Sequence, residues 1–202
     1  AGPTREPIDP VRFLSNRSSG KMGYALARAA LRRDHEVVLV SGPSALQPPK
    51  GARLVRVETA AEMLAAVRRH LPRCRVLIMA AAVADWRPAR VSPHKLKKRG
   101  GVPVLRLAPA PDILRAVRRG KGGRLFIGFA AETRNLAAEA RRKLAAKGLD
   151  AIVANDVSRR DAGFDVDTNR VTLFEPGAAA QAWPLMSKLA VRPISTQEAV
   201  VV

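Results

Sequence analysis

Residues 76–88 read VLIMAAAVADWRP, in which four consecutive apolar side chains pass into small residues and then reach one carboxylate, Asp85. An apolar run without alternation is typical of a strand that is buried on both faces, as in a parallel sheet. Ligands of open α/β sheets bind at the carboxyl edge of the strands, so we expect this strand to bring Asp85 to a ligand site. Alanines at 80–82 would let a flat or bulky ligand approach the backbone. Their alternative role is packing against a helix.

Strands and helices alternate on both sides of this run. Thr59 is a natural N-cap for the helix that follows it, and Gly148 is a natural stop for another. The expected strands are residues 36–40, 53–57, 125–129 and 151–155, and the expected helices are residues 24–31, 60–70 and 136–147. This order predicts one α/β domain over residues 1–202, with a doubly wound, mostly parallel sheet and helices on both faces.

The pattern changes after residue 156. Glycines punctuate short β runs at 170–174 and 181–183, which we interpret as a small C-terminal β arm. A last helix is expected over residues 187–194, followed by a loose tail to residue 202. The chain opens on Ala1 in a turn-like segment, so we expect that a first strand lies upstream, and that the sheet lacks it unless another segment substitutes.

Composition narrows the class of protein. With 202 residues, 47% of them hydrophobic, the chain can bury a substantial core. It has no apolar run near the ~18 residues that span a bilayer. The single cysteine, Cys74, has no partner for an internal disulfide or a zinc site. These features predict a cytoplasmic protein without membrane association.

The charge is strongly positive, with 36 Lys and Arg against 17 Asp and Glu and a net charge of +19. Such an excess favours polyanionic partners, either nucleic acid or phosphorylated small molecules. The arginines are spread along the expected helices, and only 4% of residues are aromatic, which leaves few platforms for stacking bases. We therefore expect phosphorylated small molecules as partners. A basic nucleic-acid-binding domain is the alternative, recognisable by salt-sensitive binding that ignores free nucleotide.

A phosphate site is expected where residues 15–23 (SNRSSGKMG) lead into the first helix. Ser18 or Ser19 can cap this helix, and the free amides of a first helical turn bind anions. The segment is neither a P-loop, because Ser15 and Met22 replace the required Gly and Ser/Thr, nor a dinucleotide fingerprint, which needs a third glycine and a ribose-binding acid. An ordinary capped helix is the alternative. The residues before it, 2–16, are expected to form a long loop.

A second long loop is expected over residues 83–102. Its basic residues, His94, Lys95, Lys97 and Lys98, suggest a lid that closes on an anion, although a solvated charge run is the alternative. Further along, Asp112 lies near the start of an expected helix, where a carboxylate is favoured.

The ordered motifs of the chain resemble one family over nearly its whole length, from residue 2 to residue 188. The motifs are GPTREPIDPVR (2–12), SNRSSGKMG (15–23), AAVADWRP (81–88), KLKK (95–98), PDIL (111–114), GFAAET (128–133), KGLD (147–150) and NDV (155–157). The family is phosphopantothenoylcysteine synthetase, the second half of the bifunctional bacterial protein of coenzyme A biosynthesis. The resemblance implies a Rossmann-like fold and a two-step ligation. CTP activates 4′-phosphopantothenate as an acyl-cytidylate, and the amine of cysteine then displaces CMP.

The resemblance also implies roles for individual residues. Asn16 would polarise the acyl group, Arg12 would hold the intermediate, and Lys95 would meet the triphosphate or the leaving CMP. The implied nucleotide contacts are Ala81, Ala82, Asp85, Lys95, Pro111, Asp112, Ile113, Leu114, Phe129, Lys143 and Lys147. The implied phosphate contacts are Ser18, Ser19 and Gly20. In the helix over 136–147, the two lysines share one face, four residues apart.

Partners follow from the same resemblance. Mg²⁺ is expected with the CTP phosphates, and no protein residues are assigned as its ligands. A homodimer is expected, formed through the C-terminal β arm. The upstream decarboxylase half is missing here, so this chain should not bind flavin. Ala110 stands where relatives often carry a polar residue, which leaves one nucleotide contact unfilled. The rival of another class is a non-catalytic nucleotide-binding module, but such a module could drop Asn16 or Lys95, and this chain keeps both.

Overall fold

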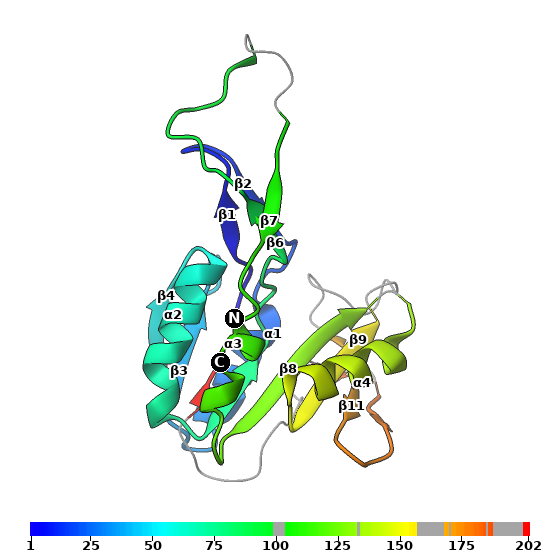
Figure 1. Cartoon of the computed structure of the whole chain (residues 1–202). Helices are drawn as coiled ribbons and strands as arrows, with labels where there is room; N and C mark the ends of the chain where they lie inside the picture. The colour runs from blue at the N-terminus through cyan, green and yellow to red at the C-terminus, as the bar shows by residue number, and fades with distance from the viewer. Residues whose placement is uncertain (99–103, 133, 157–167, 170, 185, 188–199) are drawn as a thin grey trace.

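A computed structural model describes residues 1–98, 104–132, 134–156, 168–169, 171–184, 186–187 and 200–202. Its centre is an eight-stranded sheet with the strand order β12-β11-β9-β8-β5-β14-β3-β4 (Figure 1). In chain order these strands are β3 (Val37–Ser41), β4 (Arg53–Arg56), β5 (Val76–Met79), β8 (Leu125–Glu132), β9 (Ala151–Asp156), β11 (Val171–Phe174), β12 (Gln181–Ala182) and β14 (Val200–Val201). All neighbours from β9 to β4 pair in parallel, and β11 and β12 add an antiparallel edge.

Helices cover both faces of this sheet, as expected. The α-helices are α1 (Lys21–Leu31), α2 (Ala60–His70), α3 (Ile113–Val117) and α4 (Leu136–Lys147), with 3₁₀ turns at Leu71–Arg73 and Arg118–Gly120. In β5, Val76 and Ile78 face α1, while Leu77 and Met79 face the side of α2, α3 and α4. Because successive strand residues point to opposite faces, the apolar run of β5 serves two cores at once.

The last three residues, 200–202, are not a loose tail, because β14 lies between β3 and β5 in the middle of the sheet. The N–H of Val202 donates to the carbonyl of Val38 (3.0 Å), and the N–H of Val40 donates to the carbonyl of Val202 (3.0 Å). Ala1 continues the same line, with its amino group donating to the carbonyl of Val40 (2.5 Å). The two termini therefore lie side by side (Figure 1). In the sheet, β14 thus takes the position in which a missing strand was expected.

Two segments expected to be loops contain strands instead. β1 (Arg5–Pro7) pairs with β2 (Phe13–Ser15), and β6 (Trp86–Pro88) pairs with β7 (Leu107–Pro109), both antiparallel. The two hairpins project from the body at the top of Figure 1. We call residues 5–15, 86–98 and 104–109 together the arm. Each of these strands has only three residues and shows no alternation of apolar and polar side chains. The prolines that end β1, β6 and β7 therefore favoured a loop prediction.

The residues predicted at the helix N-termini are confirmed for two helices, α2 and α3, and wrong for α1. Thr59 caps α2 by accepting from the N–H of Glu62 (3.2 Å), and Asp112 caps α3 by accepting from the N–H of Arg115 (3.2 Å). For α1 the expectation was wrong, because the N-cap is Gly20 and no side chain caps this end. Gly20 adopts a φ of 83°, which glycine tolerates readily. Ser18 and Ser19 therefore precede the cap.

The expected C-terminal β arm is only partly described. β11 and β12 extend the main sheet, and β10 (Thr168–Asn169) pairs with β13 (Met186–Ser187). The helix expected over 187–194 falls almost entirely outside the described residues. Within the described part of the chain, no helix is long and apolar enough to cross a membrane.

Candidate active site

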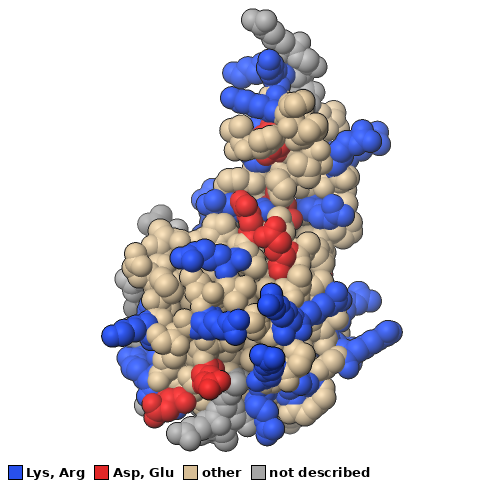
Figure 2. Space-filling model, turned by 90° about the vertical axis from the view of Figure 1, so that its left-hand side faces the viewer, with Lys and Arg blue, Asp and Glu red and all other residues tan. Residues whose placement is uncertain are grey.

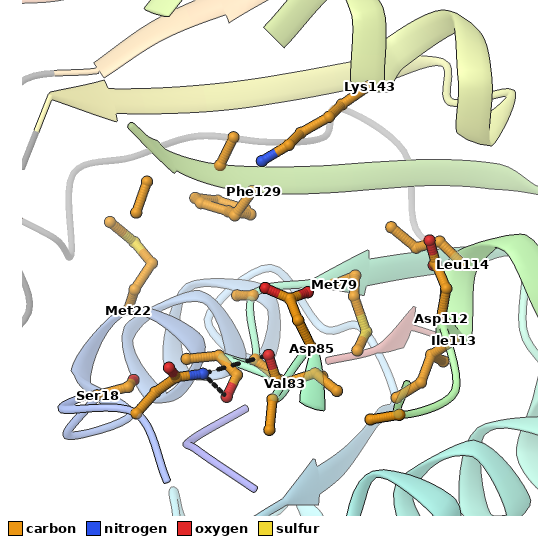
Figure 3. A pocket seen from close by; sticks show the side chains of 18 of the residues that line it. Ser18, Met22, Met79, Val83, Asp85, Asp112, Ile113, Leu114, Phe129 and Lys143 are labelled. Carbon is orange, nitrogen blue, oxygen red and sulfur yellow. Dashed lines mark hydrogen bonds between the residues drawn. The ribbon is translucent and has the colours of Figure 1, made fainter. Parts of the chain in front are cut away.

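A cavity of about 350 Å³ opens at the carboxyl edge of the parallel strands (Figure 3). It is enclosed by the start of α1, the residues after β5, the start of α3, and the ends of β8 and β9 facing α4. The lining residues are Asn16, Ser18, Gly20, Lys21, Met22, Met79, Ala80, Ala81, Ala82, Val83, Ala84, Asp85, Ala110, Pro111, Asp112, Ile113, Leu114, Phe129, Ala130, Ala131, Lys143, Lys147 and Asn155. Most residues that the resemblance implied for the nucleotide and for phosphate are thus brought together.

Asn16 is fixed at the α1 side of the cavity. Its amide nitrogen donates to the carbonyl oxygens of Ala82 (2.9 Å) and Val83 (3.2 Å), shown as dashed lines in Figure 3. An amide group has two N–H donors, so both are occupied in this conformation and the carbonyl oxygen is left as an acceptor. The role implied by resemblance, in which Asn16 donates to the acyl group, requires it to exchange one of these two bonds.

The three residues implied to bind phosphate line two different hollows. Ser18 and Gly20 line the cavity, and the Ser18 hydroxyl accepts from the N–H of Gly20 (3.3 Å). Ser19 lines a second, more open groove of about 1060 Å³, which also contains Arg5 and Arg56. Asn16 and Ser18 belong to both hollows. The start of α1 therefore separates a nucleotide-sized cavity from a larger groove.

Lys143 and Lys147 reach the cavity from one face of α4, the face that their spacing predicted them to share. Lys143 forms an ion pair with Glu132 (2.6 Å), and Lys147 forms one with Asp112 (3.2 Å). Figure 3 shows the Lys143 ammonium above the ring of Phe129, inside the cavity. Each pair presents an ammonium donor beside a carboxylate acceptor, which is the kind of pattern that a base edge or a ribose can recognise. The sequence analysis missed Glu132, although it follows directly on the small residues of the GFAAET motif.

Two carboxylates, Asp85 and Asp112, line the cavity. Within the part of the chain that the structure describes, no group of three or more His, Cys, Asp or Glu side chains could hold a metal ion by itself. Mg²⁺ in nucleotide sites is usually held by one or two carboxylates together with substrate phosphates. The two carboxylates fit that mode of binding, so they are the candidates for holding Mg²⁺ together with a bound nucleotide.

Arg12 and Lys95, in contrast, do not line the cavity. Both lie on the arm, where the Arg12 guanidinium donates to Asp9 and to the carbonyl of Leu96 (2.9 Å). Lys95 is exposed there. The side chain of Asp9 is fully buried, and the Arg12 hydrogen bond holds the pKa of that carboxyl well below its usual range. The sequence could not predict this separation, because nothing local in it revealed the arm.

Positive charge is not confined to the cavity. On the face shown in Figure 2, Lys and Arg side chains are spread over both the body and the arm, and acidic side chains are fewer. This distribution matches the spread of arginines along the chain, and the surface forms no single basic stripe on this face.

A mostly parallel α/β sheet with a nucleotide-sized cavity at its carboxyl edge defines a protein of the nucleotide-binding Rossmann-like class. Residues 1–196 match the family model of the DNA/pantothenate metabolism flavoprotein C-terminal domain, and the chain belongs to this family.

Similar proteins agree with this assignment. The coenzyme A biosynthesis bifunctional protein CoaBC of Bacillus subtilis is 50% identical over 190 residues, which cover 94% of this chain and 47% of that protein. The crystal structure of a CoaBC C-terminal domain superposes with a TM-score of 0.79 at 44% identity, covering 94% of this chain and 85% of that one. A Cab2 variant in complex with phosphopantothenate-cysteine shares the fold alone, with a TM-score of 0.75 at 16% identity over 91% of this chain and 78% of the other. The chain spans less than half of the Bacillus relative.

Proposed function

We propose that this chain catalyses the CTP-dependent ligation of 4′-phosphopantothenate and cysteine, a step in coenzyme A biosynthesis. The observation that carries the proposal is the single cavity that gathers Asn16, Asp85, Phe129 and Lys143 at the carboxyl edge of the sheet. Membership of the family, and 50% identity to a protein of coenzyme A biosynthesis, support it. A protein of the same fold binds phosphopantothenate-cysteine, which is consistent with the proposed product.

The nucleotide would occupy the cavity. Its base would lie against Phe129 with the Lys143–Glu132 pair at its edge, and its ribose would lie near the Lys147–Asp112 pair. The triphosphate would extend toward the start of α1, where the first-turn amides and Ser18 favour anions. Mg²⁺, held by the phosphates together with Asp85, would offset the charge of the triphosphate.

The reaction would proceed in two displacements. A carboxylate oxygen of 4′-phosphopantothenate attacks the α-phosphorus of CTP, forming the acyl-cytidylate and releasing pyrophosphate. The cysteine amine then attacks the acyl carbon, the amide bond forms, CMP leaves, and the amine loses a proton. Asn16 would contribute in the second displacement, either by accepting from the cysteine amine through its free oxygen or by moving a donor onto the acyl oxygen.

The active enzyme would be a homodimer. We propose the arm as its interface, in place of the C-terminal β arm that was expected from the sequence. Among the described residues, the exposed large apolar side chains lie on the arm, with the exception of Leu125; they are Val11, Phe13, Trp86, Val91, Val104, Leu105 and Leu107. Contiguous exposed apolar surface marks interaction sites. A second copy is the occupant we favour, because the arm carries Arg12 and Lys95 outside the cavity of its own chain, and pairing of arms can bring these cations to a cavity of the dimer.

Pyrophosphate release tests the proposal directly. With 4′-phosphopantothenate present, CTP should release pyrophosphate without cysteine until the enzyme is loaded, and cysteine should convert this burst into steady turnover. ATP in place of CTP tests nucleotide choice. If CTP binds but no pyrophosphate is released, the chain is a non-catalytic nucleotide-binding module. If it binds nucleic acid in a salt-sensitive way and CTP does not compete, it is a basic nucleic-acid-binding domain.

A further inference from the structure

Asp9, at the tip of the β1–β2 hairpin, is the most heavily bonded carboxylate among the described residues. It accepts from the backbone N–H groups of Val11, Arg12 and Leu96 and twice from the Arg12 guanidinium, at 2.5 to 3.1 Å. Its side chain has no exposed surface, although it lies on a projecting arm without a large core. Burying an ionised carboxylate is costly unless every oxygen is satisfied, and here both oxygens are.

These bonds have two different consequences. Those to Val11 and Arg12 are local and shape the turn between β1 and β2. The bond to Leu96 joins residues that are 87 positions apart and ties the basic segment at 95–98 to the hairpin. Arg12 reinforces this tie, because its Nη2 donates both to Asp9 and to the carbonyl of Leu96. Lys95, next to Leu96, is thereby held near Arg12.

We propose that Asp9 is a positioning residue that holds Arg12 and the Lys95 segment as one cationic unit for the substrate. The proposal rests on the proposed ligase function, which gives both cations a role. Arg12 uses Nε and Nη2 on Asp9 and Leu96, and no hydrogen bond within the described chain engages its Nη1. The Arg12 side chain is 45% exposed, so the two N–H groups of its Nη1 can meet a phosphate or carboxylate group while Nε and Nη2 stay fixed.

A carboxylate is required for this role by the groups that face it. Every group within hydrogen-bond distance of Asp9 is a donor, so the NH₂ group of an asparagine would meet N–H groups on whichever side it lay. The lowered pKa, caused first by Arg12, keeps Asp9 ionised at neutral pH. Asp9→Asn therefore removes the ion pair with Arg12 and sets an NH₂ group against N–H donors on one side, which weakens the tie while changing almost no volume.

Limited proteolysis tests the tie itself. Trypsin cleavage after Lys95, Lys97 and Lys98, followed by mass spectrometry, should become about tenfold faster or more in Asp9→Asn, the scale of losing a hydrogen bond to a charged group. Leu96→Pro removes the N–H at the loop end, and because trypsin does not cleave a Lys–Pro bond, this variant is scored only on cleavage after Lys97 and Lys98. Leu96→Ala, which keeps that N–H, is scored at the same two sites as its control. Glu139→Gln breaks another carboxylate–arginine pair at the same spacing, with Arg142, and should leave cleavage at 95–98 unchanged.

Kinetics separates positioning from a general loss of structure. Asp9→Asn and Leu96→Pro should lower kcat for pyrophosphate release about as much as Lys95→Gln does, and combining either with Lys95→Gln should add little. Unchanged cleavage in Leu96→Pro, or effects that multiply with Lys95→Gln, would overturn the proposal. If Asp9→Asn does not fold, Leu96→Pro against Leu96→Ala still decides it. A wild-type chain that releases no pyrophosphate under any condition rejects the ligase function, whereas the proteolysis result stands independently.

Discussion

Asn16, like Ser18, lines both the cavity and the larger groove. Its side chain bonds the carbonyls of Ala82 and Val83, so it joins the start of α1 to the segment that follows β5. An amide is suited to this position because one group donates to two carbonyl oxygens while the other remains an acceptor. A carboxylate in its place would face those same oxygens and repel them.

Asn16→Ala should therefore separate the two displacements. Loss of the side chain leaves Ser18 and the first-turn amides of α1 in place for the triphosphate, so pyrophosphate should still be released in a burst. Product formation should fall by about 10²-fold or more, the usual cost of removing a polar group aimed at developing charge. The acyl-cytidylate should then accumulate and be detectable by mass spectrometry. Ser15→Ala, next to it on β2 and outside the cavity, is the control. Normal turnover in Asn16→Ala would remove Asn16 from the mechanism.

At the scale of elements, the sequence predicts best those parts whose signals are local. α2 and α4 have the bounds that were expected, because Thr59 and Gly148 mark their ends with residues suited to caps. The arm was missed because its three-residue strands are stabilised by pairing across a gap in sequence, residues 8–12 in one hairpin and residues 89–106 in the other, and such short strands leave no periodicity in the sequence. From the residues alone, residues 80–82, Asp85 and the start of the first helix were expected at a ligand site, because strand ends and helix starts meet at one edge in this fold. The other predicted lining residues were implied only by the family resemblance.

The histidine at the C-terminal end of α2 predicts how the stability of the fold depends on pH. His70 is buried there, and burial lowers its pKa, with the nearby charges of Arg53, Arg69 and Arg73 acting in the same direction. The unfolded chain takes up a proton near pH 6.5 that the native His70 resists, so stability should fall as the pH drops below that value and gain nothing further above about pH 7.5.

His70→Gln should flatten this dependence. The urea midpoint of the wild type should be lower at pH 5.5 than at pH 7.5, and the difference should shrink in the variant. His94→Gln is the matched control because His94 is exposed on the arm. A variant with the wild-type difference between the two pH values would show that His70 is not the group responsible.

At the scale of the whole molecule, the sheet depends on a strand from the far end of the chain. β14 lies between β3 and β5, and Val200, Val201 and Val202 are each at most 3% exposed. Sequence reasoning expected a loose tail there, because three valines at a terminus carry no signal of the partners they will find. Residues 200–202 also lie outside the span of 1–196 that matches the family model, so family membership did not predict this pairing either.

Val201→Thr tests whether this strand completes the sheet. Threonine has nearly the shape of valine and keeps the backbone ladder, but it buries a hydroxyl in the core that Val201 shares with Leu77 and Val40. That burial should cost about 1–3 kcal/mol of unfolding free energy, which corresponds to a drop of roughly 1 M in the urea midpoint. Val104→Thr makes the same chemical change at a side chain that is 88% exposed, so it should stay within about 0.5 kcal/mol of the wild type. Equal midpoints for the two variants would mean that β3 and β5 do not depend on β14, and the sheet would then have to close without the end of the chain.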